Sequence, residues 1–256
     1  MIQIMLISLL ISLVIQIGFF SYAATKKTDK VTDLSYGLTF ILIALFFLVS
    51  SSFQLIQVIL FFMVLAWGLR LVSYLLTRIL KIKADSRFDE IREDFFKFAG
   101  FWLIQAVTVW VIMLPSVFIL QSTKSLQPTI LTLVGFGVWL TGLTIETLAD
   151  KQKFEFKNKK ENKGKWIQSG LWKYSRHPNY FGEILCWWGI YIFVLPFLSG
   201  WEYLTIVSPL FISFMLLFVS GIPPLEKRYN ERYKDNEDYQ KYKNDTPLII
   251  PFINLK

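Results

Sequence analysis

Residues 98–120 read FAGFWLIQAVTVWVIMLPSVFIL and contain no charged side chain. A run of about 20 apolar residues can cross the hydrocarbon core of a bilayer as a single helix. Six more runs of similar character occupy residues 2–23, 35–50, 53–77, 129–147, 181–199 and 203–223. With 54% apolar side chains, the 256-residue chain has too many long runs for one soluble domain. The sequence therefore predicts an all-α polytopic membrane protein with seven transmembrane helices.

Two of these runs have an alternative interpretation. Only the three serines at 50–52 separate the second run from the third, so a fused run and six spans in all would be the other solution. The first run could be a secretory signal peptide, because residues 21–23 (Ser-Tyr-Ala) resemble a cleavage site. It has no Lys or Arg before it, and it is longer than the usual apolar region of about 7–15 residues, so we expect a span.

The positions of the basic residues predict the orientation. Segments 24–34, 78–97, 148–180 and 224–256 carry 25 of the 27 Lys and Arg residues, and they fall on one side of the membrane if seven spans are present. Of the other two, Lys124 lies in a loop on the opposite side and Arg70 lies within a span. Because basic loops stay on the cytoplasmic side, we expect the N-terminus outside and the C-terminus in the cytoplasm. Topology thus accounts for the net charge of +8, and we expect no nucleic-acid partner.

Several kinds of site are excluded or disfavoured. The sequence has neither a P-loop nor a Gly-x-Gly-x-x-Gly motif opening a βαβ unit, so helices and loops must hold any nucleotide. A single cysteine, Cys186, rules out a disulfide within the chain, and a single histidine, His177, rules out a metal centre built on several imidazoles. We therefore expect no metal. No repeat or long linker divides the chain, so residues 1–256 are expected to form one membrane domain.

A dense polar cluster precedes the sixth run. Residues 170–183 read GLWKYSRHPNYFGE and hold the only histidine. Charged, amide and aromatic side chains at a membrane entry point are costly beside lipid, which indicates a functional site. Glu146 and Asp150, four residues apart at the inner end of the fifth run, share one helical face and precede a lysine-rich segment.

The same cluster suggests a ligand. Asn179 and Glu183 are also four residues apart, and an amide with a carboxylate can pair with a primary carboxamide. Lysines 151, 153, 157, 159, 160, 163 and 165 can neutralise phosphates. The combination favours a nicotinamide dinucleotide phosphate over a compact sulfonium donor.

Each feature also has a structural interpretation. The lysines can form a solvated loop, Glu183 can stabilise the first turn of a helix, and Arg70 can extend its side chain to the inner interface. Trp166, Trp172, Trp187 and Trp188 can be interfacial anchors instead of ligand contacts.

The polar cluster resembles the C-terminal signature of the steroid 5-alpha-reductase superfamily, most closely its bacterial branch. The resemblance covers about the last 120 residues and continues in Glu146, Asp150, Glu226, Arg228, Tyr239, Tyr242 and residues 250–252 (Ile-Pro-Phe). The cluster is also similar to the signature of the sterol C14 reductases, because it contains Asn179 and Glu183. Isoprenylcysteine carboxyl methyltransferases generally lack these two residues. The resemblance implies an enzyme of a bacterial inner membrane that binds NADPH from the cytoplasm.

The resemblance also implies roles for individual residues. Asn179 and Glu183 would bind the nicotinamide carboxamide. The ribose and phosphate groups would be surrounded by Asp150, Lys157, Arg176, His177, Arg228, Tyr239 and Tyr242, and Glu146, Tyr174 and Tyr180 would complete the cofactor site. Residues 126–256 would then form the cofactor-binding half, and residues 1–125 the substrate-side helices.

The N-terminal half departs from the steroid enzymes. Those enzymes hold a 3-oxo group with an early glutamate and a third-span tyrosine, but residues 34–84 contain no acid and Trp67 takes the tyrosine position. Arg70 and Tyr74 do match, and they are our candidates for polarising a substrate carbonyl. We expect an NADPH-dependent reductase of an activated carbon–carbon double bond in a lipophilic substrate that enters from the bilayer lipids. The alternatives are an S-adenosylmethionine-dependent membrane methyltransferase and a non-catalytic lipid-binding protein.

Overall fold

The structure is a computed structural model, and it describes residues 2–82 and 91–253, with the side chains of residues 78–82 left out. Residues 83–90 of the expected inner segment therefore lie outside the described residues. In the described ranges the chain is helical and has no strand. Within the described residues, seven helices are long and apolar enough to cross a membrane, which confirms the predicted fold class: the chain is an integral membrane protein.

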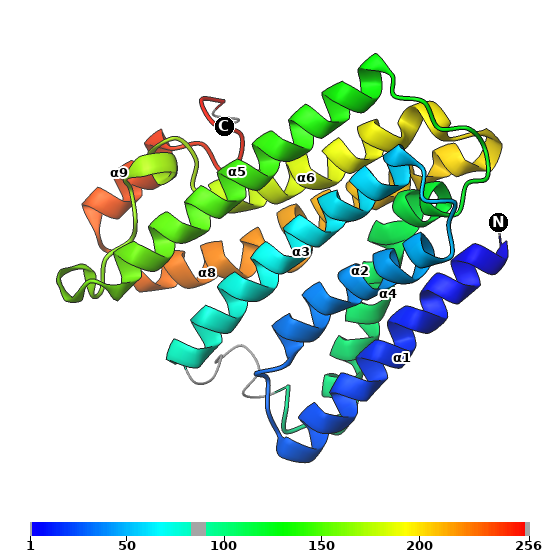
Figure 1. The fold of residues 1–256 in the computed structure, drawn as a ribbon. Helices are drawn as coiled ribbons and strands as arrows, with labels where there is room; N and C mark the ends of the chain where they lie inside the picture. The colour runs from blue at the N-terminus through cyan, green and yellow to red at the C-terminus, as the bar shows by residue number, and fades with distance from the viewer. Residues whose placement is uncertain (1, 83–90, 254–256) are drawn as a thin grey trace. The chain divides into compact units, whose positions relative to one another are not determined.

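The spans follow the apolar runs (Figure 1). They are α1 (Ile2–Lys26), α2 (Thr32–Val49), Leu55–Thr77 of α3 (Leu55–Ile82), α4 (Phe95–Leu120), α5 (Ile130–Asn158), Pro178–Phe197 containing α6 (Pro178–Val194), and Gly200–Arg232.

The serines at 50–52 do separate two helices. Helix α2 ends at Val49 and α3 begins at Leu55. The Gln57 side chain stabilises this break, because its Oε1 accepts hydrogen bonds from the Gln54 backbone N–H at 2.9 Å and from the Ser52 hydroxyl at 3.3 Å. The six-span alternative is therefore wrong.

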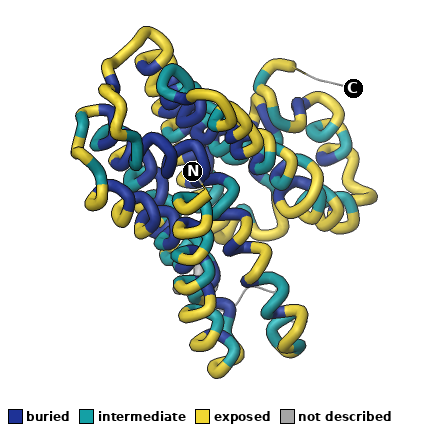
Figure 2. The backbone as a smooth tube through the Cα atoms, turned by 90° about the vertical axis from the view of Figure 1, so that its right-hand side faces the viewer, coloured by how far each residue is buried: buried dark blue, intermediate teal, exposed yellow. Residues whose placement is uncertain are grey.

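The chain divides into two compact units. Unit 1 contains residues 1–134 and 190–208, and unit 2 contains residues 135–189 and 209–256. In unit 1, α1 packs on α4 and α2, and α2 packs on α3. Many large apolar side chains of these helices are exposed, as expected for lipid-facing positions, and Figure 2 shows exposed positions recurring along the helices.

A buried network of polar side chains joins three helices of unit 1. Gln105 of α4 donates from Nε2 to Gln16 Oε1 of α1 at 2.9 Å and to Ser35 Oγ of α2 at 3.0 Å. Gln16 donates in turn to Thr39 Oγ1 at 2.8 Å. Interhelical hydrogen bonds of this kind stabilise helix association where lipid replaces water. The network therefore explains why these polar residues are tolerated inside apolar runs.

In unit 2, α5 and α6 approach each other closely through glycines. A Cβ atom on Gly142 would lie 2.6 Å from the Gly182 carbonyl oxygen, and one on Gly189 would lie 2.4 Å from the Trp139 nitrogen. A Cβ on Gly182 would similarly meet the Glu146 nitrogen at 2.6 Å. Small residues allow such backbone contact between membrane helices. The contact places Glu146 against the start of α6.

The structure adds two details to the predicted spans. Helix α5 continues to Asn158, well past the apolar run, because its charged end is rich in good helix formers such as Lys, Gln and Glu. The last span is a composite of η5 (Gly200–Ile206), α7 (Val207–Phe214), a π-helical turn η6 (Met215–Val219) and α8 (Ile222–Arg232). Pro223 and Pro224 lie in the first turn of α8, where the missing N–H groups cost nothing. A short helix, α9 (Glu237–Asp245), follows.

Candidate functional site

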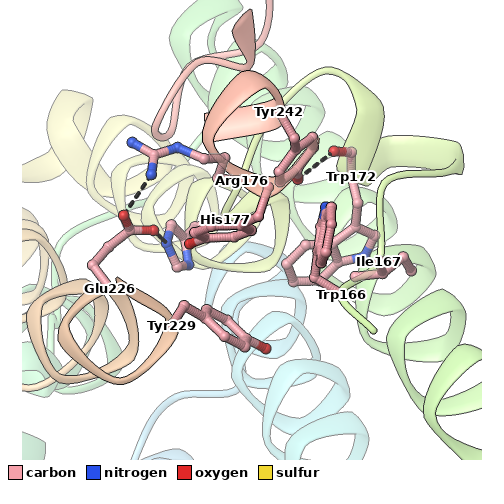
Figure 3. Close-up of a pocket in the computed structure, with 9 residues that line it drawn as sticks. Trp166, Ile167, Trp172, Arg176, His177, Glu226, Tyr229 and Tyr242 are labelled. Carbon is pink, nitrogen blue, oxygen red and sulfur yellow. Dashed lines mark hydrogen bonds and ion pairs between the residues drawn. The ribbon is translucent and has the colours of Figure 1, made fainter. Parts of the chain in front are cut away.

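A small pocket lies in unit 2 between the loop before α6 and the C-terminal helices (Figure 3). Its volume of about 20 Å³ accommodates one water-sized molecule. Its lining is mostly aromatic, with a few charged groups: Trp166, Ile167, Trp172, Arg176, His177, Glu226, Tyr229, Tyr239 and Tyr242.

The carboxylate of Glu226 organises the polar side of this pocket. Arg176 Nη1 donates to Glu226 Oε2 at 2.5 Å, and His177 Nε2 lies 2.8 Å from Glu226 Oε1. Figure 3 shows both side chains converging on this carboxylate. A carboxylate only accepts hydrogen bonds, so Nε2 of His177 is the donor. Glu226 therefore fixes the orientation of both basic side chains.

His177 is held as a neutral imidazole. Burial lowers the pKa of His177 below its ordinary value, and this effect exceeds the opposing influence of the Glu226 carboxylate. Since Nε2 carries the proton, Nδ1 is left as an acceptor. Nδ1 is buried and has no hydrogen-bond partner among the described residues, so it can receive a hydrogen bond from a ligand hydroxyl.

An aromatic wall faces these groups. Trp166 lies edge-on to Tyr233 and Tyr239, with ring centroids 5.2 Å apart in both pairs. Burial, followed by the nearby Glu226 carboxylate, raises the pKa of Tyr239 to about 12, so its hydroxyl stays protonated. The Trp166 Nε1 and Arg176 Nε groups are buried and lack partners within the described ranges. The pocket thus offers two spare donors and one spare acceptor.

The C-terminal segment holds the loop before α6 in place. The Arg176 backbone N–H donates to the Pro247 carbonyl at 2.9 Å, and Ser175 Oγ donates to the Ile249 carbonyl at 2.8 Å. The Tyr242 hydroxyl donates to the Trp172 carbonyl at 2.8 Å. These contacts make the C-terminal segment part of the site.

A second group of polar residues lies where α5 and α6 meet. Glu146 and Asp150 of α5 are buried, and Asn179 and Glu183 of α6 are half-buried. The Asn179 Oδ1 atom is itself buried and makes no hydrogen bond to any described residue. A buried amide oxygen without a partner is costly, so a ligand or an ordered water must supply a donor at this position.

The predicted site residues are distributed over three places. Arg176, His177, Tyr239 and Tyr242 line the pocket. The rest of the predicted cofactor site lies elsewhere in unit 2. Glu146, Asp150, Asn179 and Glu183 lie at the α5–α6 contact, and Lys157 and Arg228 are exposed. The Tyr180 ring stacks on His177 with centroids 5.7 Å apart, and the Tyr174 ring lies 5.0 Å from that of Phe252. Arg70 and Tyr74 are half-buried on α3, in unit 1. Their roles stay predictions.

Sequence reasoning did not include several pocket residues in the site. Glu226 entered only through the resemblance, although it makes the central contacts. It lies 49 residues from His177, so no local spacing could reveal the pair. Trp166 and Trp172, for which the sequence allows both an anchoring role and a ligand contact, line the pocket. Trp187 and Trp188 do not; Trp187 is buried and Trp188 donates to Ser213 Oγ at 3.2 Å.

The chain is distantly related to curated mammalian steroid dehydrogenases. It is 32% identical over 122 residues to human 3-oxo-5-alpha-steroid 4-dehydrogenase 1, and 30% and 28% identical to the proteins of that name from Macaca fascicularis and Rattus norvegicus. In each case the match covers 47% of this chain and 41% of the relative.

No solved structure matches the chain. A family model described as "Protein of unknown function (DUF1295)" matches residues 19–246, which is most of the sequence. The chain therefore belongs to the DUF1295 family, with a distant, steroid 5-alpha-reductase-like relationship to the mammalian enzymes.

Proposed function

We propose that this protein is an NADPH-dependent membrane reductase that reduces an activated carbon–carbon double bond of a lipophilic substrate. One observation carries the proposal. The Asn179 Oδ1 atom is buried, has no hydrogen-bond partner among the described residues, and lies one helical turn from Glu183. An amide oxygen and a carboxylate are the acceptors that the N–H groups of a nicotinamide carboxamide require. The distant similarity to 3-oxo-5-alpha-steroid 4-dehydrogenase 1 supports the same class.

The spare groups of the pocket fit the rest of such a cofactor. Arg176 Nε and Trp166 Nε1 are donors suited to phosphate oxygens, and His177 Nδ1 is an acceptor suited to a ribose hydroxyl. When bound, NADPH supplies hydride from its nicotinamide ring. Since the pocket has a volume of only about 20 Å³, a dinucleotide that used it would have to displace side chains that line it, such as Tyr239 and Tyr242.

The substrate side is less closely specified by the chain. Arg70 and Tyr74 are the proposed donors that polarise a conjugated carbonyl on the substrate, which makes the double bond a better hydride acceptor. The early acid of the steroid enzymes has no counterpart in residues 34–84. We therefore propose a lipid enone as the substrate class, with the cofactor site facing the cytoplasm of a bacterial inner membrane.

The aromatic lining of the pocket favours one second candidate. Trp166, Tyr229, Tyr239 and Tyr242 beside the Glu226 carboxylate resemble the surroundings that bind a sulfonium or ammonium cation. An S-adenosylmethionine-dependent methyltransferase would need such a cation-binding pocket, and at about 20 Å³ the pocket would have to open for this cofactor as it would for the dinucleotide.

One experiment separates the two candidates. The thermal stability of the detergent-purified protein would be measured with NADPH, NADH and S-adenosylmethionine, because a ligand that binds only the native state raises the apparent stability by RT ln(1 + [L]/Kd). We expect selective stabilisation by NADPH, followed by oxidation of NADPH with a lipophilic enone. Selective stabilisation by S-adenosylmethionine would replace the reductase with the methyltransferase, and no effect of either ligand would contradict both.

A further inference from the structure

A second, polar pocket lies in unit 1, at the end where α4 finishes. The first turns of α1, the end of α4, the loop after it and η5 form its walls. Its volume of about 190 Å³ is enough for a small polar group. The lining residues are Ile4, Phe118, Ile119, Gln121, Ser122, Thr123, Lys124 and Glu202.

The charges in this pocket are unusual for their side of the membrane. In the predicted topology, Lys124 and Glu202 are the two charged side chains in the segments outside the membrane, and both line this pocket. Lys124 Nζ donates to Ser199 Oγ at 2.7 Å, and Glu202 Oε2 accepts from the Ser199 backbone N–H at 2.8 Å and from Ser199 Oγ at 3.1 Å. Ser199 thus joins a cation and an anion at the pocket wall.

The surroundings indicate the headgroup level of a bilayer. Trp201 and Tyr203 flank Glu202 and are 73% and 48% exposed, and aromatic rings of this type gather at membrane interfaces. Ile7 lies one helical turn from Ile4 on the same face of α1 and is 41% exposed, which provides an apolar surface beside the pocket. A polar pocket adjoining an exposed apolar helix has the two parts that a phospholipid needs.

We propose that this pocket binds an ammonium–phosphate zwitterion, the headgroup of a phosphatidylethanolamine. The primary ammonium donates to the Glu202 carboxylate, and the phosphate accepts from Lys124 and from the hydroxyls of Ser122 and Thr123, with the acyl chains along α1. An ethanolamine headgroup compensates both charges of the pocket. A choline headgroup has no N–H donor for Glu202, and an anionic glycerol headgroup leaves Glu202 without a cation. This inference is independent of the proposed reductase activity.

The test measures lipid binding to delipidated, detergent-purified protein. Thermal stability and native mass spectrometry would be recorded with phosphatidylethanolamine, phosphatidylcholine, phosphatidylglycerol and soluble phosphoethanolamine. We expect phosphatidylethanolamine to stabilise at the lowest concentration, and phosphoethanolamine to act only at much higher concentration because it lacks the acyl chains. Equal effects of the three lipids would overturn the proposal, and stabilisation by phosphoethanolamine alone would replace the lipid with a soluble zwitterion.

Three variants locate the site. Glu202→Gln keeps a residue suited to the helix cap formed with Ser199, but removes the charge, so it should abolish the preference for ethanolamine over choline. Lys124→Gln should weaken binding of all three lipids about tenfold, as expected for loss of a charged hydrogen bond. Thr123→Trp, at an exposed position, should block the pocket.

The matched controls are Lys30→Gln and Glu161→Gln, both at exposed positions that do not line the pocket. They should bind like the unmodified protein. If Glu202→Gln and Thr123→Trp retained the full ethanolamine preference, the lipid would bind elsewhere and the proposal would be wrong.

Discussion

His177 lines the pocket in unit 2 together with Arg176 and Glu226. The pKa of His177 lies below 6.5 because burial disfavours the imidazolium. The unfolded chain therefore takes up the proton at a higher pH than the folded chain does. The contribution of His177 to stability is complete above about pH 6.5 and is lost as the pH falls below that value.

This linkage predicts an acid-sensitive step that His177 controls. The melting temperature should fall between pH 7 and pH 5, and His177→Gln should reduce that fall because the substitute does not titrate in this range. Differential scanning fluorimetry in one detergent, with ionic strength held constant, measures both. The same acid sensitivity in the two proteins would show that other groups are responsible.

Asn179 and Glu183 carry the nicotinamide assignment at the level of single side chains. Asn179→Ala and Glu183→Gln should each weaken NADPH binding about tenfold or more, because each removes a hydrogen-bond acceptor for the carboxamide. Calorimetric titration with NADPH measures the loss. Asn158→Ala, at an exposed position at the end of α5, is the control and should bind normally. Unchanged affinity in both site variants would remove the assignment.

At the level of elements, the contact between α5 and α6 depends on backbone proximity. Gly189→Ala would put a methyl group 2.4 Å from the Trp139 nitrogen, so the two helices must separate and stability should fall by about 1–3 kcal/mol. Gly137→Ala lies on the same α5 helix with nothing within 4 Å, and it should be neutral or stabilising by up to about 1 kcal/mol. Thermal unfolding compares them. If both variants behaved alike, close packing would not be the reason for Gly189.

The positions of the membrane-spanning helices were largely predictable from the sequence, but the extension of α5 and the π-helical turn in the last span were not. The length of each apolar run and its lack of charged residues located the seven spans found in the described residues, because the lipid requires both of a spanning helix. The extension of α5 to Asn158 and the π-helical turn at Met215–Val219 lay outside that signal. They depend on helix propensity beyond the membrane and on local backbone geometry, neither of which changes hydropathy.

At the scale of the molecule, the two pockets differ in how far sequence could anticipate them. The polar cluster at residues 170–183 indicated where one pocket would form, but Glu226 and the aromatic wall come from distant segments that only folding brings together. The pocket with Lys124 and Glu202 had no sequence motif, since the two residues are far apart in the chain. The residue types in the sequence indicate the chemistry of a site, whereas only the folded structure shows which distant residues meet there.

The Gln16–Ser35–Gln105 network should support the whole of unit 1. Gln105→Leu removes hydrogen bonds to two other helices, each worth about 0.6–1.7 kcal/mol in a membrane. It should lower the melting temperature measurably. Gln127→Leu, in an exposed loop, is the control and should have little effect. A normal melting temperature for Gln105→Leu would mean that apolar packing alone holds α1 and α4 together.

The same network has a consequence during biosynthesis. Gln105 follows Gln16 by 89 residues, which a ribosome adds in roughly 5–20 s. During that interval α1 and α2 can already pair, because Gln16 donates to Thr39 and accepts from the Ser35 hydroxyl at 3.4 Å, but the shorter hydrogen bond from Gln105 must wait for α4. The pair of first helices therefore spends several seconds in the membrane before its polar network is complete.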